Sequence, residues 1–342
     1  MNKWYDRENE NSDVVISSRI RLARNFSDYK FGERLEKADA ERMVNAVVAS
    51  FQKDFDNGYD YVFMNGCSDT QKKALKEQRI ISSALVKSTS GAAIISKDEG
   101  TVVQVNSDDH IRIQTLECGM NLKDCFARAN EIDNYIDAHF DYAFDRKYGY
   151  KTTYPTNVGT GLRAGYTLHL PALNESRKIS QITSEVGRFG LKIRPLYSDD
   201  DNVYASLYQV STQKSLGLTE EAIIKDLNDI VWQIVNQERS QRQYLYEKDK
   251  YHAEDVAYKS YGVLKYARKL SYRDAMSLLS EFMLGVSLDI IKLKNPSGLA
   301  INRILMDIQP AVINNTAPKA ISVDDTEILR ARYMRNNLPE IV

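Results

Sequence analysis

The sequence predicts an α+β protein, in which an antiparallel β-sheet flanked by helices is followed by an all-helical C-terminal domain. In the first two thirds of the chain, short runs rich in β-branched residues are separated irregularly by helical segments, which favours an antiparallel or mixed sheet over a doubly wound one. From Thr219 onward, apolar residues recur every three or four positions, the period of an α-helix. We therefore expect two domains, 1–248 and 249–342, with the boundary near 245–255.

The expected strands are apolar runs bounded by turn residues. They span 14–22, 80–86, 92–96, 102–105, 111–116, 166–170, 191–196 and 203–210. Helical periodicity marks the segments 38–55, 123–139, 178–189, 219–248, 253–270, 272–284 and 299–313, and a charged final segment spans 324–337. In the helix that begins near Thr219, Ile223, Leu227 and Ile230 share one face.

Composition narrows the functional class. The 342 residues include 46 basic and 47 acidic side chains, a balance unlike that of a protein that coats nucleic acid or an anionic membrane. No run approaches the roughly 18 apolar residues of a membrane span, and the polar N-terminal segment is unlike a signal peptide. Cys67, Cys118 and Cys125 are too scattered for a disulfide framework or a zinc site. We expect a cytoplasmic protein without a metal-binding cluster of its own.

Arginine residues recur on the polar face of several expected strands. Because successive strand residues point to opposite faces, Arg19 and Arg21 share one face, opposite Ile20. The same alternation gives three further polar sets: His110, Arg112 and Gln114; Arg163, Gly165, Thr167 and His169; and Lys192 with Arg194. If these strands belong to one sheet, about five guanidinium groups converge on one surface.

Such a cluster of guanidinium groups fits a polyphosphate. Each group offers a rigid fork of donors that matches pairs of phosphate oxygens, whereas without an anion the groups repel one another. Transfer of a terminal phosphoryl group requires mainly positioning and charge neutralisation, which the cluster supplies. The alternative is that each arginine is a solvated strand residue with a carboxylate neighbour.

A glycine-rich segment, Asn157-Val158-Gly159-Thr160-Gly161, precedes the strand that carries Arg163. Glycine-rich turns let backbone N–H groups approach a phosphate closely. The segment is not a P-loop, because no Lys-Ser/Thr pair follows it. We expect Asn157, Gly159, Thr160 and Gly161 to form a substrate-contacting loop.

Several longer stretches resemble the phosphagen (guanidino) kinases, and within them the bacterial protein-arginine kinases of the McsB type. They are 17–25 (SSRIRLARN), 106–114 (NSDDHIRIQ), 155–164 (PTNVGTGLRA) with 169–173 (HLPAL), and 208–221 (YQVSTQKSLGLTEE). Gln309-Pro310-Ala311 and Arg330-Ala331-Arg332 are similar to that family's tail. We expect a C-terminal helical domain as in the protein-arginine branch, and no N-terminal helical domain of the kind found in creatine and free-arginine kinases.

The resemblance implies an ATP-dependent kinase for arginine side chains in proteins, with Mg²⁺ held mostly by phosphate oxygens and water. Positions that hold the nucleotide in that family match Ser17, Ser18, Arg19, Arg21, Arg112, Arg163 and Arg194. Arg79 stands where the family has an adenine-side histidine, and a guanidinium group also stacks on an aromatic base. The implied partners are substrate proteins, including a heat-shock repressor and the Clp unfoldase, a zinc-containing activator protein, and a second copy of the chain. Phosphoarginine then marks proteins for degradation.

Two catalytic positions depart from the family pattern. Its NEED-H string has a catalytic glutamate where this chain has Asp108, and Ser107 replaces the glutamate before it. A second catalytic glutamate of the family matches Asp199, with Asp200 and Asp201 as alternatives after a shift in register. A carboxylate pair orients the target guanidinium and accepts its proton. Aspartate keeps the charge but is one methylene shorter, and an offset of about 1 Å can cost on the order of 10²-fold in rate.

Other departures concern regulation and the tail. Tyr154 replaces a reactive cysteine, and Pro195 replaces a glycine. The family's phosphoarginine-binding RDxxRA motif reads Thr326-Glu327-Ile328-Leu329-Arg330-Ala331 here. We expect a degenerate phosphoarginine pocket formed by Thr326, Glu327, Arg330 and Ala331.

Three functional hypotheses follow. The first is an active protein-arginine kinase in which Asp108 and Asp199 are catalytic. The second is a pseudokinase or adaptor that binds nucleotide without turnover, because both aspartates and the tail depart from the pattern. The third is a kinase for free arginine or another small guanidino compound. In all three, His110 and His169 are expected to be structural, since carboxylates already supply the base.

Overall fold

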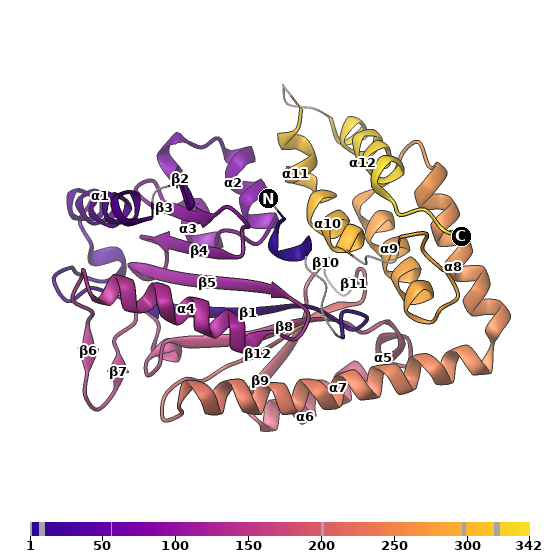
Figure 1. Cartoon of the computed structure of the whole chain (residues 1–342), viewed down its shortest axis with the longest axis horizontal. Coiled ribbons are helices and arrows are strands. Elements are labelled where there is room, and N and C mark those ends of the chain that lie inside the picture. The colour runs from indigo at the N-terminus through magenta and orange to yellow at the C-terminus, as the bar shows by residue number, and fades with distance from the viewer. Residues whose placement is uncertain (1, 7–10, 56, 200–201, 296–298, 318–321) are drawn as a thin grey trace.

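A single antiparallel sheet forms the centre of the protein, and the computed structural model describes residues 2–6, 11–55, 57–199, 202–295, 299–317 and 322–342 (Figure 1). Its eight strands lie in the order β2-β3-β4-β5-β1-β8-β12-β9. They are β1 Val15–Arg24, β2 Tyr59–Phe63, β3 Ala92–Ser96, β4 Thr101–Val105, β5 Ile111–Cys118, β8 Leu162–His169, β9 Leu191–Pro195 and β12 Leu207–Thr212. Two short hairpins stand apart from it: β6 Phe144–Asp145 with β7 Gly149–Tyr150, and β10 Ser198–Asp199 with β11 Asn202–Val203.

The helices form two groups: the first is associated with the sheet, and the second makes up the C-terminal part of the chain. The first group is α1 Lys37–Asp54, α2 Asp69–Glu77, α3 Ser83–Lys87, α4 Leu122–Asp137, α5 Pro171–Glu175, α6 Ile179–Arg188 and α7 Glu220–Lys248. The C-terminal helical region consists of α8 Lys250–Tyr266, α9 Tyr272–Ser287, α10 Leu299–Asp307, α11 Pro310–Asn315 and α12 Val323–Asn337. It lies at one end of the sheet, on the right in Figure 1. None of the described helices is long and apolar enough to cross a membrane.

The two faces of the sheet have different characters. Ile20, Leu22 and Tyr166 belong to one buried core together with apolar residues of α1, α4 and α7. Alternation places Arg19 and Arg21 on the opposite face. These helices therefore cover the apolar face. On the opposite face, the segment that contains α3 covers the β3–β4 end, where Ile95 and Val102 pack against Leu85, and the part around Arg21 lines a cleft.

The expected α+β architecture, with an antiparallel sheet and a helical C-terminal region, is confirmed. The expected strand at 80–86 is wrong, because this segment contains α3, whose N-cap Ser82 accepts a hydrogen bond from the backbone of Leu85 at 3.1 Å. The expected helix at 299–313 is interrupted: α10 ends at Asp307 and α11 begins at Pro310, since proline lacks the N–H that an uninterrupted helix requires. The expected strand at 203–210 is divided between β11 and β12.

A buried ion pair connects the sheet-containing part to the C-terminal helical region. Glu238 on α7 is fully buried, accepts a 2.7 Å hydrogen bond from Arg242, and accepts the backbone N–H groups of Ala172 and Leu173 at 3.1 and 2.9 Å. Arg242 in turn donates to the hydroxyl of Ser287 on α9 at 2.9 Å. The two bonds from the backbone of α5 to Glu238 take the place of the side-chain N-cap that α5 lacks.

We expect Glu238→Ala to lower the free energy of unfolding by about 3–5 kcal/mol, because it leaves the Arg242 charge buried without a counter-ion and two backbone N–H groups without an acceptor. Urea unfolding followed by circular dichroism measures the change. The exposed Glu247→Ala on the same helix is the matched control and should stay within about 0.5 kcal/mol of the unsubstituted chain. A Glu238→Ala loss below about 1 kcal/mol would contradict a structural role for this pair.

Candidate active site

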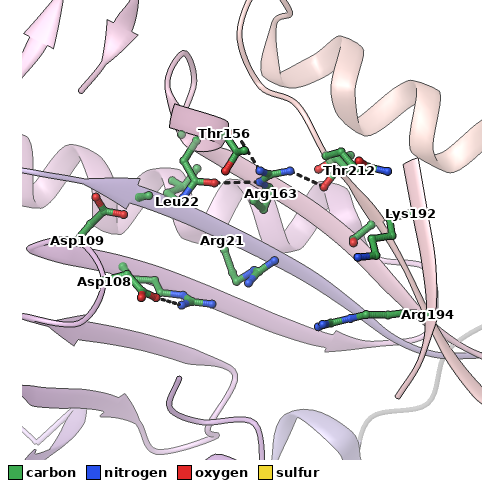
Figure 2. A pocket seen from close by; sticks show the side chains of 15 residues that line it. Arg21, Leu22, Asp108, Asp109, Thr156, Arg163, Lys192, Arg194 and Thr212 are labelled. Atoms are coloured by element: carbon green, nitrogen blue, oxygen red, sulfur yellow. Dashed lines mark hydrogen bonds and ion pairs between the residues drawn. The ribbon is translucent and has the colours of Figure 1, made fainter. Parts of the chain in front are cut away.

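Strand register brings the sequence-predicted arginines onto one surface. Arg21 on β1 lies opposite Gln114 on β5 and Arg163 on β8, while Arg194 on β9 lies opposite Gln209 on β12. Paired residues project from the same face of an antiparallel sheet. Figure 2 shows the Arg21 and Arg194 guanidinium groups pointing toward one another across this face.

These side chains line a cleft of about 420 Å³. Its basic walls are Arg21, Arg112, Arg163, Lys192 and Arg194, and its acidic residues are Asp108 and Asp109. The rest of the lining consists of residues 22, 23, 156, 157, 161 and 211–213. The cleft is therefore a strongly basic depression with two carboxyl groups at one side.

Most of the guanidinium groups are held by neutral oxygens. Arg163 donates to the side chain of Asn157 at 3.0 Å and to the carbonyls of Thr212 and Thr156 at 2.8 and 2.9 Å. Arg194 donates to the amide oxygen of Gln209 at 2.8 Å. Neutral acceptors orient a guanidinium group without cancelling its charge, so the positive charge remains available to an anion.

Arg19 and Arg21, both on β1, are likewise not paired with a carboxylate among the described residues. Arg19 donates to the amide oxygen of Gln114 at 3.0 Å, and Arg21 makes no hydrogen bond or ion pair with another residue of the described ranges. The alternative in which every arginine has a carboxylate neighbour is thus wrong for these residues. Arg112, however, does have a carboxylate neighbour, Asp108, at 3.1 Å, and the buried Arg24 is paired with Asp133 at 2.7 Å.

Crowding of like charges changes the acid–base behaviour of the cleft. Burial, and then the neighbouring charges of Arg112, Arg163, Arg194 and Arg79, lower the pKa of Arg21 from its usual range to about 9. Burial is also the largest cause of a lowered pKa at Arg19 and Arg163. Each shift means that the close approach of these guanidinium groups disfavours their own positive charge, which an anion would relieve.

We expect Arg21→Gln to raise the unfolding free energy of the ligand-free chain by about 1–2 kcal/mol at pH 7 while weakening nucleotide binding. The folded pKa of about 9 lies well below the unfolded value, so the charge penalty is complete below pH 9 and is relieved as the pH rises from there toward the unfolded pKa. Urea unfolding at pH 7 and at pH 10 should therefore show a smaller difference between variant and unsubstituted chain at pH 10. A variant less stable at pH 7 would contradict the repulsion.

Arg79 occupies a strained position at the end of α2. It has a φ of +65°, the left-handed conformation that glycine usually supplies after a helix, and its backbone N–H donates to Lys76 at 2.9 Å. Its side chain donates to Thr167 at 2.8 Å, and its carbonyl accepts from Gln114 at 2.7 Å. A strained backbone held by contacts on both sides is typical of a functional position.

The two predicted serines lie on opposite faces. Ser17 shares the arginine face, opposite Thr167, and its buried hydroxyl has no hydrogen-bond partner among the described residues. Ser18 instead donates to the carbonyl of Gly119 at 2.6 Å and accepts the backbone N–H of Asn121 at 2.6 Å. Alternation along β1 directs the Ser18 side chain to the helix-covered side, so the predicted role of Ser18 in nucleotide binding would fall to its backbone.

Two carboxylates on the loop between β4 and β5, those of Asp108 and Asp109, line the cleft. Asp108 lies 3.1 Å from the guanidinium of Arg112, and its side chain is 28% exposed. Asp109 is buried and accepts hydrogen bonds from Asn25 at 2.8 Å and from the backbone of Thr153 at 2.6 Å. Asp108 is thus the carboxylate available to a ligand, while Asp109 fixes the loop.

The second predicted catalytic carboxylate is placed only by its backbone. Asp199 pairs with Asn202 in the β10–β11 hairpin; its side chain, and both Asp200 and Asp201, lie outside the described residues. The base of this hairpin packs on the C-terminal helical region, since the rings of Tyr197 and Tyr204 each lie edge-on to Tyr272, with centroids 6.4 Å apart.

The glycine-rich loop contributes only part of itself to the cleft. Asn157 and Gly161 line it, whereas Gly159 and Thr160 do not. Gly161 has a φ of +66°, and a Cβ there would lie 2.6 Å from the carbonyl of Ala23. The glycine is needed to bring the loop against β1, because any side chain would collide with that strand.

Both histidines on the arginine-bearing strands are structural. Nδ1 of His110 accepts the backbone N–H of Phe26 at 3.0 Å, so Nε2 donates to the carbonyl of Lys30, also at 3.0 Å. His169 is buried 2.8 Å from the hydroxyl of Ser280. Burial lowers the pKa of both, which keeps them neutral.

The tail motif lies in α12, within the C-terminal helical region. Arg330 is buried and donates to the carbonyls of Ile308 and Leu270 at 2.9 and 3.1 Å. Thr326 donates to Asn314 at 2.6 Å, Glu327 lies 3.6 Å from Lys269, and Ala331 is buried. These four residues are part of one helix surface and its packing, apart from the cleft.

Two residues that orient arginines of the cluster were not predicted from the sequence. Gln209 and Thr212 provide acceptors for Arg194 and Arg163. Gln209 could have been found from the alternation Leu207-Tyr208-Gln209-Val210-Ser211, in which Gln209 and Ser211 share a polar face. The carbonyl of Thr212 had no such signal, because backbone acceptors leave no mark in a sequence.

Comparisons with known proteins agree with this geometry. Residues 39–241 match the family model described as ATP:guanido phosphotransferase, C-terminal catalytic domain, and residues 250–341 match that of the protein-arginine kinase McsB C-terminal domain. The chain is 35% identical to the protein-arginine kinase of Bacillus subtilis, over 99% of this chain and 93% of that protein. It is 38% identical to the protein-arginine kinase of Clostridium novyi, over 100% and 99% of the two chains.

Solved structures show the same fold at lower identity. A lombricine kinase superposes with a TM-score of 0.59 at 19% identity, covering 67% of each chain. The duplicated taurocyamine kinase of Schistosoma mansoni superposes with a TM-score of 0.58 at 22% identity, covering 66% of this chain and 33% of that one. With a basic cleft on the fold of guanidino kinases and full-length relatives at more than a third identity, the chain belongs to the protein-arginine kinases of the ATP:guanido phosphotransferase family.

Proposed function

We propose that this chain transfers the γ-phosphoryl group of ATP to the guanidinium groups of arginine side chains in proteins. The observation that carries the proposal is the set of arginines on one sheet face, held by neutral oxygens beside an accessible carboxylate. Full-length relatives named protein-arginine kinase support the same substrate class.

In this proposal the arginine cluster binds the polyphosphate. Arg19, Arg21, Arg112, Arg163 and Arg194 neutralise the phosphate oxygens, and Ser17 and Arg79 contact the nucleotide at the far end of the cluster. The described residues include no group of three metal-ligating side chains. Mg²⁺ would accordingly be bound by phosphate oxygens and water, where it neutralises charge on the transferring group.

The acceptor side consists of Asp108, with Asp199 as its proposed partner. Asp108 orients the target guanidinium and accepts the proton that it loses. A nitrogen of that guanidinium then attacks the γ-phosphorus, the new N–P bond forms, the bond to the bridging oxygen breaks, and ADP leaves. Asn157 holds Arg163 in place during transfer, which extends the role of the loop from binding to positioning.

The test uses the purified chain, Mg-ATP and an arginine-rich unfolded protein, with phosphoarginine detected by mass spectrometry under neutral handling. A parallel sample contains free arginine, and another adds a zinc-containing activator protein. We expect phosphoarginine on the protein and none on free arginine. Consumption of ATP with free arginine alone would overturn the protein substrate, and ATP binding without any phosphoarginine would instead support a pseudokinase.

We further propose two domains that meet between Lys248 and Asp249, and a cytoplasmic dimer that takes part in the stress response. The three cysteines are free thiols, which suits a reducing compartment such as the cytoplasm.

The proposed dimer surface lies on helix α8. The side chains of Tyr251, Tyr258 and Tyr266 are 87%, 49% and 74% exposed there, and such an aromatic surface is suited to contact with a second copy of the chain. Light scattering should give twice the 39.1-kDa chain mass. A heat-shock repressor and a Clp unfoldase are the proposed substrates, on the strength of the family resemblance.

A further inference from the structure

A carboxylate of the sheet-containing part binds a helix of the C-terminal helical region. Glu77, the last residue of α2, accepts the backbone N–H of Ala311 at 2.6 Å. Ala311 is the second residue of α11, whose N-cap Gln309 makes no side-chain capping bond. An N–H in the first turn has no acceptor within its own helix, so Glu77 supplies it from outside.

The contact lies in a protected environment. Ala74 on α2 packs with Ala311 and Val312 in a small buried cluster, and α2 and α11 lie side by side near the top of Figure 1. Burial raises the pKa of Glu77, while the N–H groups of Ala311 and Val312 lower it. A hydrogen bond that is shielded from water is stronger than an exposed one.

The α11 end of this contact is itself fixed. Gln309 accepts a hydrogen bond from the hydroxyl of Tyr272 at 2.9 Å and donates to the carbonyl of Leu305 at 2.8 Å. Arg330 donates to the carbonyl of Ile308, directly before Gln309, at 2.9 Å. The N-terminus of α11 is therefore a rigid support for whatever binds to it.

The other end of the contact leads to Arg79, which does not line the cleft but lies close enough to Arg19 and Arg21 for its charge to act on them. Two residues after Glu77, Arg79 takes its left-handed conformation, and the backbone N–H of Ile80 returns to the carbonyl of Leu75 at 2.9 Å. These bonds close the end of α2 into one unit. Any displacement of Glu77 therefore moves Arg79, whose guanidinium is held by a single 2.8 Å bond to Thr167.

We propose that Glu77 is a positioning residue for nucleotide binding: by binding the N-terminus of α11, it holds the end of α2 so that Arg79 points into the arginine cluster. The C-terminal helical region thereby sets nucleotide affinity through one carboxylate–amide contact. The inference rests on the proposed function, in which Arg79 contacts the nucleotide. Glu77 itself touches no substrate and acts only through Arg79.

The test measures the Kd of Mg-ATP by calorimetry and the KM and kcat for phosphoarginine formation in full-length variants. Glu77→Ala should raise Kd and KM by about five- to tenfold and leave kcat at saturating ATP within about twofold, because it removes binding that the ground state and the transition state share. Glu77→Gln keeps an oxygen acceptor and should stay within about twofold of the unsubstituted chain. In Glu77→Asp the side chain is one methylene shorter, so its Kd and KM should lie between those of Glu77→Ala and Glu77→Gln.

Two controls separate positioning from a general loss of structure. Asp69→Ala removes an exposed carboxylate from the other end of the same helix and should leave Kd unchanged. In a chain that already carries Arg79→Ala, adding Glu77→Ala should not raise the Kd of Mg-ATP further, since the two residues act as one unit. An additional loss in that background, or an unchanged Kd for Glu77→Ala and Glu77→Asp, would overturn the inference. If the unsubstituted chain failed to bind Mg-ATP, the proposed function would fall and the inference with it.

Discussion

Replacing Asp108 by asparagine is expected to lower kcat by about 10²- to 10⁴-fold and to leave ATP binding intact or slightly tighter. The carboxylate is the partly exposed acid of the cleft and the one positioned to accept a proton from a guanidinium, and loss of a general base typically costs this much. It also neutralises part of the Arg112 charge at 3.1 Å, so its removal makes the nucleotide side more positive. Phosphoarginine formation gives kcat, and calorimetry gives the Kd of Mg-ATP.

The matched control is Asp108→Glu, which restores the residue that the family pattern has at this position. The kcat of Asp108→Glu should equal or exceed that of the unsubstituted chain. The double variant Asp108→Glu/Asp199→Glu should show a larger increase in kcat. If Asp108→Asn turned over at the unsubstituted rate, the base would have to be another group. Asp109 is poorly suited to that role, because Asn25 and the backbone of Thr153 already bind it.

Arg163→Ala is expected to weaken Mg-ATP binding by about 10²- to 10³-fold and to abolish measurable turnover. Arg163 is fixed by three neutral acceptors on two segments, Asn157 and Thr156 before β8 and Thr212 on β12. A preoriented guanidinium group makes charge-assisted bonds to phosphate worth about 1.5–3 kcal/mol each, and two such bonds account for the expected loss. Calorimetry measures the change in Kd.

Arg163→Lys provides the control for charge. Lysine keeps the positive charge but cannot make the same planar set of bonds, so its Kd should lie between those of Arg163→Ala and the unsubstituted chain. Thermal unfolding should change little in either variant, because Arg163 is only partly buried. Turnover by Arg163→Ala at the unsubstituted rate would remove Arg163 from the phosphate site.

Strand alternation was sufficient to predict the arginine face. The face of Arg19 and Arg21 follows from a single strand, and the register with β5 and β8 then places Gln114 and Arg163 beside Arg21. The pattern works because one face of each strand is buried, so that a slip by one residue would bury the arginines. The sequence could not show that neutral acceptors hold these groups, since the carbonyls of Thr156 and Thr212 belong to the backbone.

Several features that the sequence did not predict depend on capping or on contacts between distant segments. Residues 80–86 form an apolar run, yet Ser82 caps a short helix there, and a short apolar run fits either structure. Ser18 occurs in the same motif as Arg19, but the bonds to Gly119 and Asn121 direct it to the other face. The role inferred for Glu77 depends on α11, more than 230 positions further along the chain, and no local pattern connects the two.

The most direct test of the account is ³¹P nuclear magnetic resonance of the unsubstituted chain with Mg-ATP and an arginine-rich protein, beside the Asp108→Asn variant. We predict that the γ-phosphate signal of ATP declines while a phosphoramidate signal grows in equal amount, and that the variant binds ATP but converts it at most a hundredth as fast. Tight binding of ATP by the unsubstituted chain with no phosphoramidate signal would contradict the claim that this arginine-lined cleft, with Asp108 at its edge, catalyses transfer to arginine.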